Sequence, residues 1–258
     1  MADWITSRDN PWLKSLRRTA QDNQAYRKYG EVWLEGEHLV DAVVRHAQPV
    51  RTLVCAESHW TRLPTLWQSL GDRQVLLPDP LFNAISGLDS PAGVGVLFAV
   101  PEPRPLVPGV ATVVLDRLQD AGNVGAILRS AAALGFEQVL ALAGTAALWS
   151  PKVLRAGMGA HLALHLIEGV STQELAGLGV PLLATSSHQG PYLHELIRLG
   201  TLPHPAAWLM GHEGQGVSDA LLAQASLTVR IAQPGGQESL NVAAAAAICL
   251  HASATMAL

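Results

Sequence analysis

The sequence predicts an α/β fold with a mostly parallel sheet and helices on both faces, preceded by a small α/β domain. One observation behind this is the alternation, beyond residue 110, of short strand-like apolar runs with helix-length segments, which is typical of βαβ units. Another is the proline-rich stretch over 101–108, whose four prolines can neither continue a helix nor enter a central strand. We therefore expect a domain over 1–100, a linker over 101–109 and a second domain over 110–258.

The composition indicates a folded protein. Hydrophobic residues make up 49% of the chain and charged residues 15%, which excludes an intrinsically disordered chain. The longest apolar run, 242–250, is far shorter than the ~20 residues that a membrane-spanning helix needs, and the start of the chain has no apolar signal core. We therefore expect a cytoplasmic protein with no membrane partner. Its two cysteines, Cys55 and Cys249, are too few for a disulfide framework or a cysteine-built zinc site.

In the first domain, short β-branched runs alternate with helical segments. This pattern predicts strands and helices of a small α/β domain. The expected strands lie over 51–55, 74–77 and 94–100, and the expected helices over 11–21 and 37–46.

A basic segment lies near the start of the chain, although the net charge of the whole chain is −4. Its six cations are opposed by only two aspartates, and they are Arg8, Lys14, Arg17, Arg18, Arg27 and Lys28. The negative net charge argues against a broad polyanion-binding surface, so a nucleic acid would be bound locally. The first four cations are therefore candidates for RNA contact, with an ordinary solvated helix face as the alternative.

In the second domain, the expected strands lie over 111–115, 138–141, 181–185, 206–210 and 227–231. In a parallel sheet the carboxyl ends of the strands lie at one edge, where ligands collect in the adjoining loops. The loops that follow Leu115, Met210 and Ile231 are therefore the candidates for a functional site.

The first of these loops reads D-R-L-Q-D-A-G-N-V-G-A-I-L-R-S. Asn123 can cap a helix that runs to Leu134, and Arg129 lies on the second turn of that helix. Six positions correspond to about 600° of helical rotation, so the two side chains lie about 120° apart around the axis. They can flank one site without touching. A capped helix with a solvated arginine is the alternative.

The second loop reads G-H-E-G-Q-G over 211–216 and leads into a helix. Its three glycines permit positive φ and a close approach of the backbone to a bound cofactor. Their order is not the dinucleotide fingerprint, and Arg230 and Ile231 stand where an acidic ribose ligand would be needed. A nicotinamide site is therefore disfavoured, and an ordinary glycine-rich turn is the alternative to a ligand loop.

The third loop reads I-A-Q-P-G-G-Q-E-S-L-N-V over 231–242 and precedes the long C-terminal helix. Ser239 and Asn241 stand at the start of that helix, where free backbone N–H groups and the helix dipole favour an anion such as a phosphate. Plain N-capping by Ser239 is the alternative.

Three loops that carry N-x-G-x-x-x-R, G-x-E-G-x-G and S-L-N-V in this order are much more specific than any one of them. From about Val110 to the C-terminus, the sequence resembles the SpoU/TrmH-type RNA 2′-O-ribose methyltransferases of the SPOUT class. The segments S-R-D-N-P-W-L-K-S-L and W-L-E-G-E-H-L-V in the first domain are similar to the RNA substrate-binding domain of many members.

The resemblance implies a C-terminal trefoil knot, which is an exception to the rule against threaded chains, and a homodimer with the site at its interface. It implies S-adenosylmethionine as the cofactor and no metal. The implied cofactor-binding residues are Gly211, Ile231 and Leu240, with Gly214 and Thr185 as further candidates. The implied catalytic residues are Asn123, Arg129, Glu213, Ser239 and Asn241.

The implied reaction is methyl transfer from S-adenosylmethionine to a ribose 2′-hydroxyl of ribosomal or transfer RNA. A guanidinium is a poor base at neutral pH, so Arg129 would activate the hydroxyl through a neighbouring RNA phosphate. Ser239 and Asn241 would anchor that phosphate, Asn123 would orient Arg129, and Glu213 would hold the loop or the ribose. The alternatives are a non-catalytic RNA-binding or ribosome-assembly protein that retains the fold, and a nucleotide-dependent oxidoreductase.

The chain departs from the family pattern at four positions, which are Ala121, Gly157, Ala232 and Gln233. The usual D-P-x-N reads D-A-G-N, the usual I-P-M reads I-A-Q, and the usual S-x-G-A reads G-M-G-A. None of these changes removes a side chain to which the resemblance gives a chemical role. They are expected to alter loop stiffness and cofactor affinity.

Overall fold

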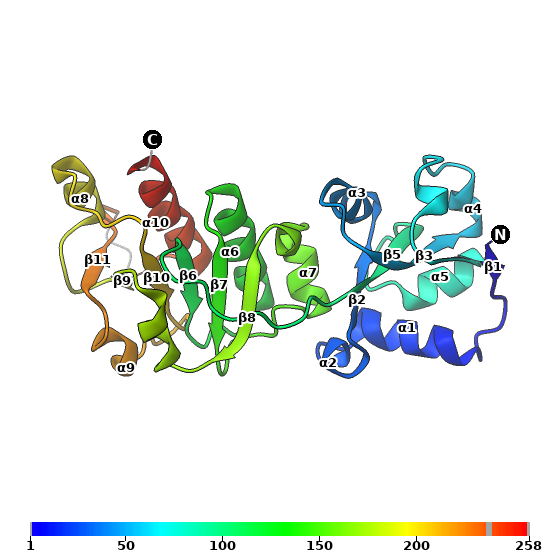
Figure 1. Ribbon diagram of the computed structural model, residues 1–258, viewed down its shortest axis with the longest axis horizontal. Coiled ribbons are helices and arrows are strands. Elements are labelled where there is room, and N and C mark those ends of the chain that lie inside the picture. The colour runs from blue at the N-terminus through cyan, green and yellow to red at the C-terminus, as the bar shows by residue number, and fades with distance from the viewer. Residues whose placement is uncertain (1, 236–238, 257–258) are drawn as a thin grey trace. The chain divides into compact units, whose positions relative to one another are not determined.

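The computed structural model describes residues 2–235 and 239–256 (Figure 1). The chain forms two compact units. The first consists of Met1–Glu102 and Trp149–Leu162, and the second of Pro103–Leu148 and Ala163–Leu258. Within the described residues, none of the helices is both long and apolar enough to cross a membrane.

The first unit contains a five-stranded sheet in the order β1-β4-β3-β5-β2. Its strands are β1 (Asp3–Trp4), β2 (Glu31–Glu35), β3 (Val50–Ala56), β4 (Arg73–Leu77) and β5 (Val94–Ala99). Strands β1, β4 and β3 pair in parallel, whereas β5 runs antiparallel to β3 and β2. The three strands expected from the sequence in this unit are confirmed as β3, β4 and β5, and β1 and β2 are additional.

The helices of the first unit are α1 (Pro11–Gln21), α2 (Ala25–Tyr29), α3 (Glu37–Arg45), α4 (Glu57–Trp60), α5 (Asp79–Ile85) and α7 (Pro151–Gly157), with 3₁₀ turns η1 (Trp67–Ser69) and η2 (Ala160–Leu162). Helix α1 begins where it does because the side chain of Asn10 accepts hydrogen bonds from the backbone N–H groups of Trp12 and Leu13, 2.9 and 3.3 Å away. One face of α1 packs into the core of this unit. The two helices expected from the sequence are confirmed as α1 and α3.

The structure differs from the predicted domain boundaries at residues 149–162. The sequence pattern assigned this segment to the second domain, but it packs with the first unit. Trp149 is buried and stacks on Phe98 with 6.4 Å between ring centroids, and α7 packs against α1 and β2. Burial of the large indole of Trp149 favours packing of this segment with the first unit, and the pattern of strand and helix lengths does not predict it.

The second unit contains a six-stranded sheet in the order β11-β9-β10-β6-β7-β8. Its strands are β6 (Thr112–Leu115), β7 (Gln138–Leu142), β8 (His165–Val170), β9 (Leu182–Ser186), β10 (Ala207–Met210) and β11 (Leu227–Arg230). Every neighbouring pair is parallel, which confirms the expected parallel sheet. Strand β8 was missed, because it is a half-exposed edge strand whose apolar run is interrupted at Glu168 and Gly169.

Helices and 3₁₀ turns cover both faces of this sheet. They are α6 (Ala121–Ala133), η3 (Glu174–Leu178), α8 (Leu193–Leu199), α9 (Asp219–Leu222) and α10 (Val242–Met256). On one face, Leu209 of β10 shares a core cluster with Leu175 of η3 and Leu221 of α9. On the other face, the buried Trp208 donates a hydrogen bond from its indole N–H to Ser253 Oγ of α10, 2.8 Å away. Consecutive residues of β10, Trp208 and Leu209, thus pack against the layers on opposite faces of the sheet.

Candidate active site

Three loops meet beyond the carboxyl edge of the sheet in the second unit. We call them the β6 loop (116–120), the β10 loop (211–218) and the β11 loop (231–241), of which residues 236–238 lie outside the described residues. The ends of β6 and β10 lie side by side, since the N–H of Asp116 donates to the carbonyl oxygen of Met210 at 2.9 Å. The parallel arrangement therefore brings together loops that are far apart in sequence.

Asn123 stands at the centre of this meeting point. Its Nδ2 donates to Glu213 Oε1 at 3.3 Å, and its Oδ1 accepts from Asn241 Nδ2 at 2.9 Å. One half-buried side-chain amide thus contacts a residue from each of the other two loops. The structure brings together three of the five residues to which the family resemblance assigned catalytic roles.

The helix that carries Asn123 is not capped by it, contrary to the sequence-based expectation. The N-cap is Asp120, whose Oδ1 accepts the backbone N–H of Asn123 at 2.7 Å, and the helix α6 begins at Ala121. Because the carboxylate of Asp120 satisfies that N–H group, the side chain of Asn123 remains available for the other loops.

Asn241 caps the C-terminal helix, although the alternative interpretation gave that role to Ser239. Asn241 Oδ1 accepts the backbone N–H groups of Ala243 and Ala244 at 2.9 and 3.3 Å. Both polar ends of its side chain are therefore occupied, one by α10 and the other by Asn123. The hydroxyl of Ser239 is exposed at the same helix start.

Glu213 fastens the β10 loop to the β6 loop. Its carboxylate accepts the backbone N–H groups of Gln119 and Asp120 at 3.4 and 3.2 Å, in addition to the amide of Asn123. Burial raises the pKa of Glu213. Hydrogen bonds from its own backbone N–H, from Asn123 and from the two backbone donors together lower the pKa by more than burial raises it, so the pKa lies below its ordinary value. Glu213 is therefore held as a carboxylate that accepts hydrogen bonds rather than as an acid.

Arg129 lies exposed on α6 and does not contact Asn123. The hydrogen bonds of the Asn123 side chain within the described residues go to Glu213 and Asn241, which gives the expectation that Asn123 orients Arg129 no support. The six-residue spacing on the helix, which turns the two side chains about 120° apart, accounts for the separation.

The glycines of the β10 loop serve different purposes. A Cβ on the buried Gly211 would lie only 2.1 Å from the carbonyl carbon of Gly216 and the nitrogen of Val217, so glycine is required there by close packing. Of the three glycines, only Gly216 has a positive φ, at +70°. The exposed Gly214 donates its N–H to His212 Nδ1 at 3.0 Å, which tightens the turn.

The remaining cofactor candidates lie at the ends of neighbouring strands. Thr185, in β9, donates its hydroxyl to the carbonyl oxygen of Leu209 at 3.2 Å, and Ile231 follows β11 directly. Leu240 exposes 39% of its surface. Gln233, noted above as a departure from the family pattern, has a buried Oε1 with no hydrogen-bond partner within the described residues.

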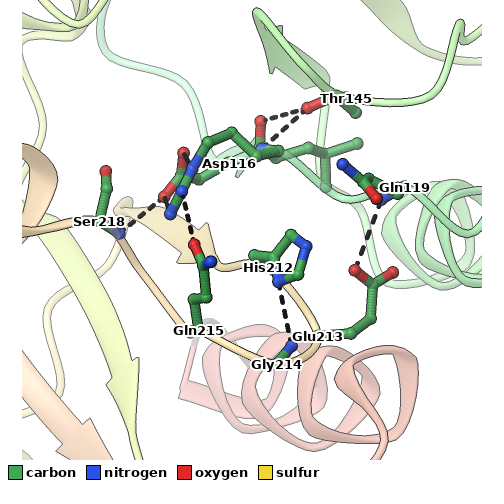
Figure 2. A network of polar contacts seen from close by, with 10 residues as sticks. Asp116, Gln119, Thr145, His212, Glu213, Gly214, Gln215 and Ser218 are labelled. Carbon is green, nitrogen blue, oxygen red and sulfur yellow. Dashed lines mark hydrogen bonds and ion pairs between the residues drawn. The ribbon is translucent and has the colours of Figure 1, made fainter.

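Sequence reasoning missed a second group of polar residues at this edge (Figure 2). They are Asp116, Arg117, Thr145, Gln215 and Ser218, and hydrogen bonds connect them across three loops. An aspartate and an arginine directly after a buried strand were a detectable signal, since charged residues rarely adjoin a core strand without a partner. Within the described part of the chain, no group of three or more His, Cys, Asp or Glu side chains could hold a metal ion.

In the first unit, the cations proposed for RNA contact lie on or just before α1. Arg8, Lys14, Arg17 and Arg18 are all exposed. Lys14 Nζ pairs with Asp9 at 3.0 Å, and Arg17 Nε donates to Gln21 at 3.4 Å. These two are weak surface contacts, which leave Lys14 and Arg17 available to a polyanion.

Beyond the carboxyl edge of a parallel α/β sheet, converging polar loops form the place where proteins of this architecture bind their ligands. The family model of the SpoU rRNA methylases matches residues 111–251. The chain belongs to the SpoU rRNA methylase family.

Several relatives resemble the chain over most of its length. A 23S rRNA guanosine 2′-O-methyltransferase of Bacillus subtilis is 29% identical over 84% of this chain and 86% of its own length. A Synechocystis protein named as a tRNA/rRNA methyltransferase is 32% identical over 96% of this chain and 92% of its own. The crystal structure of an S-adenosylmethionine-bound rRNA methyltransferase from Sinorhizobium meliloti has a TM-score of 0.83 and 25% identity, and the match covers 100% of this chain and 99% of that one.

Proposed function

We propose that this protein transfers a methyl group from S-adenosylmethionine to a ribose 2′-hydroxyl of ribosomal RNA. The contact of Asn123 with both Glu213 and Asn241 carries the proposal, because it joins the three motifs of the family at one place. The names of the relatives favour ribosomal RNA, and transfer RNA is the second candidate substrate.

The residues at the sheet edge fit the cofactor. The unpartnered Oε1 of Gln233 can accept a hydrogen bond from a ligand N–H or O–H group, and the exposed side chain of Leu240 offers an apolar surface for a ring. Gly211, at the start of the β10 loop, has no side chain, and the close packing around it leaves no room for one. Gly211, Gly214, Thr185, Ile231 and Leu240 are therefore the proposed cofactor-binding residues.

S-adenosylmethionine, when bound, supplies a methyl group that its sulfonium charge has already activated. The protein must therefore align the ribose, hold the adjoining phosphate and promote loss of the hydroxyl proton. Arg129 is a permanent cation, exposed on α6, and we assign it the phosphate next to the reacting ribose. That phosphate would accept the hydroxyl proton.

The other catalytic candidates divide into two roles. The exposed hydroxyl of Ser239, at the start of α10, is assigned to the same phosphate, where the helix dipole also favours an anion. Asn123, Glu213 and Asn241 bond chiefly to one another and to backbone N–H groups, so we assign them the task of fixing the relative positions of α6, the β10 loop and α10.

We further propose that the C-terminal segment forms a trefoil knot. Two observations support a threaded path. Strand β9 lies between β10 and β11, and the chain beyond β11 returns to the start of α6, where Asn241 meets Asn123.

A homodimer is also proposed. Helix α10 reads VAAAAAICLHASATM and is apolar around nearly its whole circumference, yet within this chain it buries one face only. The side chain of Ile248, on this helix, is 41% exposed. A helix that is apolar on all sides is normally covered on all sides, and a second copy of the chain would supply the missing cover.

Capture of RNA is assigned to the first unit, through Arg8, Lys14, Arg17 and Arg18. Their exposure and weak intramolecular pairing support this role. Local capture by one unit is also consistent with the net charge of −4, which disfavours binding over the whole surface.

The test is to map ribose 2′-O-methyl groups in ribosomal and transfer RNA from cells with and without the protein. We expect one ribosomal position to lose its methyl group, and purified protein to restore it in vitro with S-adenosylmethionine. A non-catalytic RNA-binding protein would leave every methyl group in place. Loss of a transfer RNA methyl group instead would select the second candidate substrate.

A further inference from the structure

Asp116 is a buried carboxylate just beyond β6, with only 4% of its side chain exposed. Its Oδ1 accepts Nε of Arg117 at 3.0 Å, and its Oδ2 accepts Nη2 of Arg117 at 3.4 Å and the backbone N–H of Ser218 at 2.7 Å. A buried charge is stable only when it is paired and hydrogen-bonded. Asp116 therefore ties the β6 loop firmly to the end of the β10 loop.

Arg117 reaches the β10 loop as well. Its Nη1 donates to Oε1 of Gln215 at 3.0 Å. Figure 2 shows Ser218 and Gln215, both of the β10 loop, near Asp116. We call Asp116, Arg117 and Gln215 the loop clamp.

The backbone of Arg117 is held in a conformation that arginine rarely adopts. Its φ is +60°, in the left-handed region. Its N–H donates to Oγ1 of Thr145 at 3.1 Å, and the same hydroxyl donates to the carbonyl oxygen of Leu115 at 3.0 Å. These contacts hold a backbone that glycine would adopt without strain.

The clamp and Glu213 hold the β10 loop at two neighbouring points. Gln215 lies two residues beyond Glu213, and between them the loop is folded tightly, since the N–H of Gly216 donates to the carbonyl oxygen of His212 at 2.8 Å. A shift of the loop at Gln215 would therefore move Glu213 away from Asn123. The geometry of the proposed site depends on both attachments.

The clamp does more than stabilise the fold. Asp116 is buried and needs an ion partner, but the side chain of Arg117 is 35% exposed and its backbone is held in the strained left-handed region. The contact of Arg117 with Gln215 satisfies no buried group, since Gln215 is exposed. That contact therefore acts through the β10 loop, which it holds in place.

We propose that Asp116 and Arg117 are positioning residues for methyl transfer, which hold the β10 loop so that Glu213 meets Asn123. The inference rests on the proposed function. In this role neither residue contacts the RNA or the cofactor. Each acts by holding the β10 loop in position.

The test uses the full-length variant Arg117→Gly, which removes the guanidinium and also relieves the left-handed strain. We expect its unfolding temperature to fall by only a few degrees, because the relieved backbone strain offsets part of the cost of leaving the buried carboxylate of Asp116 without its ion partner. We expect its kcat to fall about tenfold, as small misplacements in a site do, with the KM for RNA within about twofold. In the absence of cofactor and RNA, amide hydrogens of residues 211–218 should exchange faster with deuterium.

Two further variants separate the guanidinium from the backbone. Gln215→Ala removes only the acceptor in the β10 loop, and we expect it to lower kcat in the same direction. The double variant Arg117→Gly/Gln215→Ala should be no slower than Arg117→Gly alone, because both changes break the same contact. The matched control is Ala47→Gly, which relieves a second left-handed residue, φ +49°, in the first unit and should leave kcat and loop exchange unchanged.

The outcomes distinguish the inference from the function on which it rests. A wild-type protein that methylates no RNA overturns the proposed function, and the exchange experiment still reports on the clamp. An active wild type with Arg117→Gly at full kcat and with unchanged loop exchange overturns the inference. So does a Gln215→Ala variant at full kcat beside a slow and less stable Arg117→Gly, because that pair of results shows a structural role only.

Discussion

Asn241 Nδ2 donates to Asn123 Oδ1 across 2.9 Å, and 118 positions of sequence separate the two residues. The same Asn241 caps α10, and the same Asn123 holds Glu213. The starts of two helices and one loop are therefore fixed by two amide side chains.

Glu213 should make folding stability depend on pH. Its pKa is lowered below the ordinary value of 4.5, so its contribution is fully present above that value and is lost as the pH falls through the lower, folded-state pKa. Replacing Glu213 by Gln should therefore lower the unfolding temperature at pH 7 and have progressively less effect below pH ~4.5. Thermal unfolding of both proteins between pH 3 and 7 measures the difference. A difference in unfolding temperature that stays constant over this pH range would contradict the prediction.

Arg129→Ala should lower kcat and kcat/KM together by at least about a hundredfold, because it removes a group that acts in the transition state. Cofactor binding should stay unchanged, and stability should change by less than about 0.5 kcal/mol, since the side chain is exposed. Single-turnover methylation and calorimetry measure these quantities. Arg198→Ala, another exposed helix arginine, is the control. Near-normal turnover would remove Arg129 from the mechanism.

The double variant Arg17→Ala/Arg18→Ala should weaken RNA binding and reduce its salt dependence. Each phosphate contact that is lost lowers the slope of log affinity against log salt by about one. Binding measured over a series of salt concentrations gives the slope. Arg45→Ala, on α3 of the same unit, should leave both quantities intact. Unchanged affinity and slope in the double variant would assign the first unit another task.

Ile248→Asp should convert the proposed dimer into a monomer, because it places a charge in the centre of an apolar interface. Light scattering at micromolar concentration measures the mass, and circular dichroism verifies the fold. Leu199→Asp on α8 is a matched control, since its side chain is a more exposed apolar group on a different helix. A wild-type protein that is monomeric, or an Ile248→Asp protein that stays dimeric, would refute the assignment of this face.

Gln233→Met should stabilise the protein in the absence of ligand by about 1 kcal/mol, because it removes a buried acceptor with no partner within the described residues. With S-adenosylhomocysteine present, the advantage should shrink or reverse, because the ligand supplies the missing donor to the wild type only. Thermal unfolding with and without this ligand measures both effects. Destabilisation of the ligand-free protein would show that Gln233 Oε1 has a partner after all.

The sequence was most informative where a repeating pattern determines the structure. Alternating strands and helices predicted the parallel sheet, and the sheet in turn predicted which loops lie together. The resemblance to the SpoU/TrmH-type methyltransferases then selected Asn123, Glu213 and Asn241 within those loops. Pairwise contacts were not predictable in this way. Nothing in the spacing indicates that Asp120 rather than Asn123 caps α6, or that Arg117 adopts a left-handed backbone to reach Gln215.

The assignment of Trp149–Leu162 to the first unit affects the order in which the protein can fold during synthesis. The chain passes between the two units three times, so neither unit is a continuous stretch that could be released complete from the ribosome. When residue 102 has emerged, Phe98 still lacks the indole of Trp149 that stacks on it. The first unit is complete only when Leu162 has emerged, and the second only when α10 has emerged.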